Sequence, residues 1–459
     1  MSLARGARLA SLVIVASLCS ASARSEESVL VFERLSRTST LRPPSQGGPV
    51  VVDSTRSEVM VALGDHRLVA YEPTSVWIYD FARKRVQRVN TRDQVYSDWS
   101  LHSFVAFKEM ELQERLATRR RMEKARPGTE PSVLEMEALF SIQAPPKSRG
   151  RRETLADSVR DGRLTVWING RVSLEAMTTD TAFAPGRAHM FDRYLAFQAN
   201  IHPDARRALM RLGKVPRQII YRYRDFNQET VVMLRLVRIA SAPEANDPAA
   251  MAKRLDLDDP RYRELDQRLA GCKSCKGLGD WVPESQRFEA AALDSGRFLE
   301  AALARAERVM GACERDSAWS REIERRVRGD SAIAACRAGL AWRDSASAAA
   351  ALQRLDRVNG SGLERAYVLD YLRGRARIAT HHYDLAAYLM MGALGGNPCM
   401  AAGWLDLADL YMRSYQPVLA WMCLEAAEEV GSPGRCEPRL AQRAKREREL
   451  EKRYPELFE

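Results

Sequence analysis

Alternating apolar and polar residues mark the first part of the chain as a sheet. Apolar runs at residues 29–32, 58–61, 67–71 and 76–79 are separated by Gly, Pro, Asp or Ser, and a partly alternating run follows at 84–89. Runs of this length between turn-forming residues are typical of β-strands. Over residues 101–123 the spacing becomes helical, with Phe104, Phe107 and Met110 among charges. We therefore predict several strands followed by one long helix.

Strand patterns resume beyond two stretches rich in Pro, Gly and charge. Runs at 164–168 and 171–174 flank Asn169-Gly170, a pair that tolerates the positive φ of a two-residue hairpin turn. A helical segment at 187–212, interrupted near His202-Pro203, precedes two more strands at 219–224 and 230–239. Together these segments predict an α+β domain over residues 26–240, in which helices cover an antiparallel sheet.

Beyond a linker at residues 241–264, the chain reads as an all-α helical-repeat solenoid over residues 265–455. Bulky and small side chains recur at the spacing of two short helices packed face to face: Trp404, Leu407, Ala408, Tyr411, Ala420, Leu424 and Ala427. Small residues let two helices approach closely where they meet bulky ones. The same offsets recur in an earlier copy: Gly374, Tyr383, Ala386, Ala393 and Pro398.

These positions resemble the tetratricopeptide repeat, and the ending Ala426–Gly431 resembles its Sel1-like variant. Gly296, Phe298 and Ala301 suggest a further, eroded copy. The resemblance implies a solenoid that binds protein partners through its helices rather than catalysing a reaction. It does not identify the partner.

The first domain resembles the outer-membrane lipoprotein carrier class of exported half-barrels. The resemblance rests on residues 75–80, the basic run at 84–89 and Tyr96. It implies a curved sheet that holds an acyl chain under its helices. A carrier of a lipid or other hydrophobic ligand is therefore the alternative function.

The N-terminus predicts export. Arg5 and Arg8 precede an apolar run from Leu9 to Leu18, and Ala21-Ser22-Ala23 is typical of a signal-peptidase site. We expect residues 1–23 to be a cleaved signal peptide and the mature protein to be periplasmic. Leu18 stands where lipoprotein signals carry Gly or Ala, which argues against a lipid anchor. The formal charge of +11 then favours an anionic envelope surface or an acidic partner over nucleic acid.

Seven cysteines remain after cleavage, and all lie beyond residue 270. The candidates for disulfides are Cys272, Cys275, Cys313, Cys336, Cys399 and Cys436. We prefer the pair Cys313–Cys336, while Cys399 and Cys436 lie at corners between repeats and are a further candidate pair; spacing alone does not fix the connectivity. We expect Cys423 to be a small buried side chain on the stripe of Ala420 and Ala427. Cys272-Lys273-Ser274-Cys275 favours a structural bridge, with redox and metal-binding roles as alternatives because no βαβ unit surrounds it.

Recognisable catalytic motifs are absent from the sequence. It contains no zinc-protease helix motif, nucleophile elbow, phosphate-binding loop or nucleotide fingerprint. The adjacent His381 and His382 point in different directions on a helix, so they do not form an obvious metal pair. We expect a scaffold without cofactor or metal, and not an enzyme. A thiol–disulfide oxidoreductase using Cys272 and Cys275 is the third hypothesis.

Overall fold

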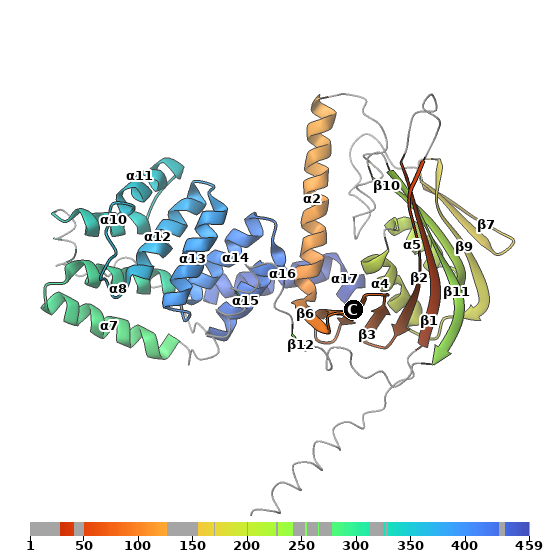
Figure 1. The fold of residues 1–459 in the computed structure, drawn as a ribbon, viewed down its shortest axis with the longest axis horizontal. Helices are drawn as coiled ribbons and strands as arrows, with labels where there is room; N and C mark the ends of the chain where they lie inside the picture. Colours follow the sequence, from red (N-terminus) through yellow and green to blue (C-terminus); the bar gives the residue numbers. More distant parts are fainter. Residues whose placement is uncertain are drawn as a thin grey trace, which may run out of the picture. The chain divides into compact units, whose positions relative to one another are not determined.

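A computed structural model gives the fold (Figure 1). It describes residues 28–40, 50–125, 155–168, 170–199, 201–225, 228–241, 253–254, 265, 278–312, 323, 325, 329–430 and 437–458. An antiparallel sheet with covering helices comes first, and a run of helices follows. This confirms the predicted fold class. The predicted signal peptide and the Cys272–Cys275 motif lie outside the described residues.

The chain divides into two compact units. Unit 1 contains residues 1–83, 87–96 and 115–253, and unit 2 contains residues 84–86, 97–114 and 254–459. The boundary between the main part of unit 1 and the main part of unit 2 thus lies between Lys253 and Arg254. Two short segments from the sheet half, 84–86 and 97–114, also belong to unit 2, which the hydrophobic pattern did not predict.

The strands form one sheet in the order β12-β6-β5-β4-β3-β2-β1-β11-β10-β9-β8-β7. Their bounds are β1 Ser28–Thr40, β2 Val50–Leu63, β3 Arg67–Tyr71, β4 Ser75–Asp80, β5 Arg85–Asn90, β6 Val95–Ser100, β7 Leu155–Arg160, β8 Arg163–Ile168, β9 Arg171–Ala182, β10 Lys214–Asp225, β11 Gln228–Ser241 and β12 Lys253–Arg254. The first and last long strands, β1 and β11, pair antiparallel and lie next to each other in the middle of the sheet. Gly170, with φ +76°, lies in the predicted hairpin turn between β8 and β9.

Two helices cover one face of the sheet, as Figure 1 shows: α4 (Arg187–Gln198) and α5 (Pro203–Met210). They correspond to the interrupted helix that the sequence predicts, and His202 caps the second one by accepting a hydrogen bond from the Asp204 amide at 3.1 Å. Phe32 of β1 stacks on Phe191 of α4 with ring centroids 5.9 Å apart. We call this face of the sheet the helix-side face and the opposite one the outer face.

Successive residues of a strand point to opposite faces, so both faces of the central strands can be buried at once. On the outer face, Val29 and Val31 of β1 pack with Ala62, Val69 and Ile78 in one apolar cluster. This explains why β1 begins with a continuous apolar run instead of an alternating one.

The long helix α2 (Leu101–Ala125) begins directly after β6. Its first residues are buried, with His102 and Val105 almost inaccessible to solvent, whereas Phe107 is exposed. The sequence places Phe107 on a broad apolar face over residues 101–123, but in the structure this side chain is exposed. The buried face of the helix is therefore narrower than predicted. Inside unit 2, His102 Nε2 lies 2.9 Å from a carboxylate oxygen of Glu451.

Unit 2 is built from antiparallel helix pairs: α7 Leu278–Asp294 with α8 Phe298–Gly311, α10 Ser331–Leu340 with α11 Ser345–Leu355, α12 Ala366–Ala379 with α13 Tyr383–Gly396, and α14 Ala401–Arg413 with α15 Pro417–Val430. The charged helix α16 (Glu437–Arg453) and the short α17 (Pro455–Phe458) end the chain. Within a pair, each helix buries its apolar stripe against its neighbour, as stacked repeats require.

Candidate functional site

The predicted repeat positions meet at the interface between α14 and α15. Trp404, Leu407, Ala408 and Tyr411 of α14 are buried, as are Ala420, Leu424 and Ala427 of α15. Trp404 Nε1 donates a hydrogen bond to the Pro398 carbonyl at 2.8 Å, so the indole is satisfied although it is fully buried. The stripe identified in the sequence is therefore a packing core and leaves no side chain available to a ligand.

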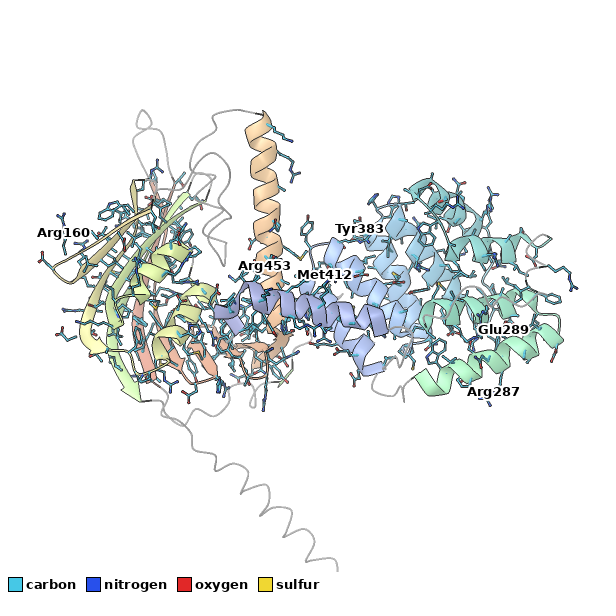
Figure 2. The ribbon with its side chains drawn as sticks, turned by 180° about the vertical axis from the view of Figure 1, so that it is seen from behind. Arg160, Arg287, Glu289, Tyr383, Met412 and Arg453 are labelled. Atoms are coloured by element: carbon cyan, nitrogen blue, oxygen red, sulfur yellow. The ribbon has the colours of Figure 1, made fainter. Side chains whose placement is uncertain are left out.

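Close approach of α12 to α13 depends on Gly374. A Cβ atom placed there would lie 2.7 Å from Met390 Cγ and 3.2 Å from the Ala386 carbonyl oxygen. Ala386 and Ala393 of α13 are fully buried. Tyr383 begins α13 (Figure 2), and its hydroxyl lies 2.9 Å from His381 Nδ1. His381 and His382 thus lie at the turn before α13, where His381 has φ +63°.

Helix α13 has an unusual surface. Asp384 is its only charged residue, yet the helix is buried on one side only. Its solvent side carries Leu385, which is 42% exposed, and Tyr388, which is 71% exposed. One turn further on, a Cβ at Gly392 would meet no atom within 4 Å. A helix that is apolar all round is normally buried on all sides, so this exposed face suits contact with another molecule.

A buried polar network ties the first helix pair of unit 2 to later ones. Glu307 of α8 is fully buried, and its carboxylate accepts hydrogen bonds from Tyr367 Oη at 2.6 Å, Asn397 Nδ2 at 2.6 Å and Ser285 Oγ at 3.2 Å. Arg365 completes the set with an ion pair to Glu307. Burial, followed by the charge of Glu307, raises the pKa of Tyr367 far above its usual range, so the phenol remains a donor.

A second buried ion pair lies beside this network. Arg308 of α8 is almost completely buried and pairs with Glu289 of α7, which Figure 2 labels. The Arg365 guanidinium lies 4.5 Å from the ring centroid of Phe288 on α7. Sequence reasoning missed these residues because Glu and Arg abound on every helix of this chain. Each member has a partner, which fits a structural network better than a reactive site.

The cysteines correct one prediction. Cys336 is a buried thiol on α10, so the preferred Cys313–Cys336 disulfide is wrong. Its side chain faces the interior of the helix pair, and burial raises its pKa to about 12. Cys423 is also a buried thiol, as expected for a small apolar side chain. Cys399 is disulfide-bonded. Cys272, Cys275, Cys313 and Cys436 lie outside the described residues, so the pairings Cys272–Cys275 and Cys399–Cys436 stay predictions.

The described residues contain neither a metal-binding cluster nor a membrane-spanning helix. Within the described ranges, no three His, Cys, Asp or Glu side chains are grouped so that they could hold a metal ion. In the same part of the chain, no helix combines the length and the apolar character needed to cross a membrane.

Comparisons with known proteins add little. No family model matches the chain, and no curated protein matches it. Among solved structures, the chain is similar to lipovitellin in a structure titled for its lipid–protein interactions, with 11% identity and a TM-score of 0.17. The match covers 92% of this chain and 50% of that one, so the chain spans about half of the lipovitellin chain.

Proposed function

We propose that this protein is an exported scaffold without enzymatic activity, whose helix pairs hold a protein partner in the periplasm. The observation that carries the proposal is the exposed apolar face of α13, defined by Leu385, Tyr388 and Gly392. Exposed Tyr and Leu side chains on a rigid helix are typical of the buried centre of protein interfaces. The rigid support comes from Ala386, Met390 and Ala393, which fix the opposite side of α13 in the core.

The geometry of the sheet supports the scaffold over a lipid carrier. A carrier needs apolar space between sheet and helices. In the described residues under α4, that space holds aromatic rings: Tyr79 stacks on Phe197 with centroids 4.7 Å apart, and Phe32 stacks on Phe191. These four rings are buried, and they close the place where an acyl chain would lie.

Site-specific crosslinking tests the proposal. A photoreactive phenylalanine analogue at Tyr388 should crosslink one partner protein in the periplasm of the native host. The same analogue at Val159 on β7, which is 57% exposed, should not. Adding Leu385→Asp to the Tyr388 protein should abolish the crosslink because a carboxylate would have to be desolvated at the interface. A product that survives Leu385→Asp, or that also forms at Val159, would refute this use of α13.

A further inference from the structure

Arginine side chains gather on the outer face of the sheet. The pairing of strands β2, β1, β11, β10, β9, β8 and β7 (Figure 1) places residues of neighbouring strands in rows that cross the sheet. Glu33 follows Phe32, which packs on helix α4, so the row of Glu33 lies on the outer face. This row and the next two outer rows contain six arginines: Arg37, Arg56, Arg160, Arg163, Arg222 and Arg235.

Two carboxylates on this face are each shared by two guanidinium groups. The four ion pairs join Glu33 to Arg56 and Arg235, and Glu175 to Arg163 and Arg222. Their partners come from different strands, which confirms that these six side chains share one face of the sheet. Because each carboxylate neutralises only one of its two arginines, each group retains one positive charge.

The whole face is therefore positively charged. Glu58 is the third glutamate of the three rows, so six arginines face three glutamates and the excess is three positive charges. The adjoining rows add Arg238 at one end and Glu229 at the other, which leaves this excess unchanged. Arg37 and Arg160 are exposed. Figure 2 shows Arg160 at the edge strand β7, on the side of the sheet away from α4 and α5.

Apolar side chains lie between the arginines. The middle row contains three half-buried aliphatic residues on neighbouring strands: Leu35, Met233 and Ile220. Met177, in the row of Glu33, is 41% exposed. Trp167 alternates with Thr165 and Arg163 along β8, so it lies on the same face, and it is partly exposed. Tryptophan is enriched where proteins meet the interface between membrane and water, because its ring is apolar and its N–H is polar.

We infer that this face, which we call the arginine face, binds the surface of a bilayer that contains anionic phospholipids. Neighbouring strands lie about 4.8 Å apart, so the arginines from β2 to β7 are spread over about 30 Å along the sheet. A single small anion could not contact so wide an array, whereas the phosphate groups of a bilayer form one. A guanidinium group matches phosphate oxygens with paired N–H donors. The apolar side chains and Trp167 then contact the interfacial region of the bilayer.

The arginine face differs in chemistry from the exposed face of α13. The α13 face is apolar and carries Leu385 and Tyr388, whereas the arginine face combines cations with aliphatic side chains. The inference therefore does not depend on the protein partner proposed for α13, and the two surfaces can be tested separately.

Sedimentation with lipid vesicles tests the inference. The purified full chain is mixed with vesicles of phosphatidylcholine alone, or of phosphatidylcholine with phosphatidylglycerol, at low and at high salt. We expect binding only to the anionic vesicles, and its loss at high salt because salt screens exposed charges. Arg37→Gln and Arg160→Gln should each weaken binding about fivefold, as expected for one cation close to an anionic membrane. Glu58→Gln should strengthen binding by a similar factor, because it removes a negative charge from the face.

Arg207→Gln is the matched control. Arg207 lies on α5, which covers the opposite face of the sheet, and its side chain is 63% exposed, so the same loss of charge there should leave binding unchanged. If Arg207→Gln weakens binding as much as Arg37→Gln, the vesicles respond only to net charge and the inference is overturned. Equal binding to neutral vesicles overturns it as well. Absence of binding to anionic vesicles also overturns it and leaves an acidic protein as the partner of this face. Since unfolding would not strengthen binding in a charge-dependent way, the gain expected for Glu58→Gln separates lost charge from lost folding.

Discussion

The phenol of Tyr367 on α12 donates a hydrogen bond of 2.6 Å to the carboxylate of Glu307, a fully buried residue on α8. Sixty residues of sequence separate the two. Together with Arg365, Asn397 and Ser285, this contact fixes the first helix pair of unit 2 against α12 and α13. The network therefore sets the relative positions of the pairs that carry the proposed binding helix.

Replacing Glu307 with Gln should destabilise unit 2 strongly. Arg365 would keep its charge in a buried place without a counter-charge, and breaking a buried pair costs about 3–5 kcal/mol. Urea unfolding followed by circular dichroism measures the loss. Glu364→Gln is the matched control: Glu364 pairs with Arg297 at 3.2 Å but is 64% exposed, so its loss should cost less than about 1 kcal/mol. Equal effects of the two changes would mean that the Glu307 network is not tightly packed.

Gly374→Ala and Gly392→Ala should have opposite effects on stability. A methyl group at Gly374 would overlap Met390 and the Ala386 carbonyl, so we expect a loss of about 1–3 kcal/mol from overpacking. At Gly392 the methyl group would meet no neighbouring atom. Because Gly392 lies inside helix α13, alanine should stabilise that helix by about 0.5–1 kcal/mol. Thermal unfolding of the two variants gives the comparison. A neutral Gly374→Ala variant would contradict the close approach of α12 and α13.

Replacing Ala420 with Leu tests the α14–α15 interface. Ala420 is fully buried in the stripe that also contains Trp404 and Tyr411, so a larger side chain must displace its neighbours. We expect a loss of about 1–3 kcal/mol in the free energy of unfolding. Ala441→Leu, at an exposed position of α16, is the control and should be close to neutral. If both substitutions are tolerated, Ala420 does not lie in the packed interface between α14 and α15.

Stability should depend on pH through Glu175. Burial alone would raise the pKa of this carboxyl, but hydrogen bonds and charge from Arg222 and Arg163 outweigh it and hold the pKa below its usual range. The folded pKa is thus below the unfolded one, so the stabilisation is present above the unfolded pKa and is lost as pH falls through the folded pKa. Glu175→Gln should therefore be less stable than the parent at pH 7, and the difference should shrink in acid. A pH-independent difference would count against this ion pair.

Thiol labelling tests the corrected cysteine assignment. Cys336 is buried and its pKa is about 12, so iodoacetamide at pH 8 should not modify it in the native protein. In urea without reductant, Cys336 and Cys423 should both react, whereas Cys399 should react only after reduction. Peptide mass spectrometry identifies the labelled residues. Labelling of Cys399 before reduction would show that its disulfide does not form in the protein.

The sequence by itself determined the elements and the fold class of this protein. Strand and helix periods are local properties, so the strands at 67–71 and 76–79, the broken helix at 187–212 and the repeat stripe around Trp404 could be read from neighbouring residues. The apolar content of those stripes also fixed which side of each helix is buried, because burying apolar surface is the dominant driving force.

Only the tertiary structure decided how these elements use their polar residues. Glu307 is one of many glutamates on charged helices until folding brings Tyr367 and Asn397 to it. Thr38 and Thr230 can share a hydrogen bond only because of the register between β1 and β11, and a shift of one residue would place the two side chains on opposite faces of the sheet. Cys336 likewise became a buried thiol through the orientation of α10. Such contacts join residues far apart in the chain, and their distances depend on packing, which no local period contains.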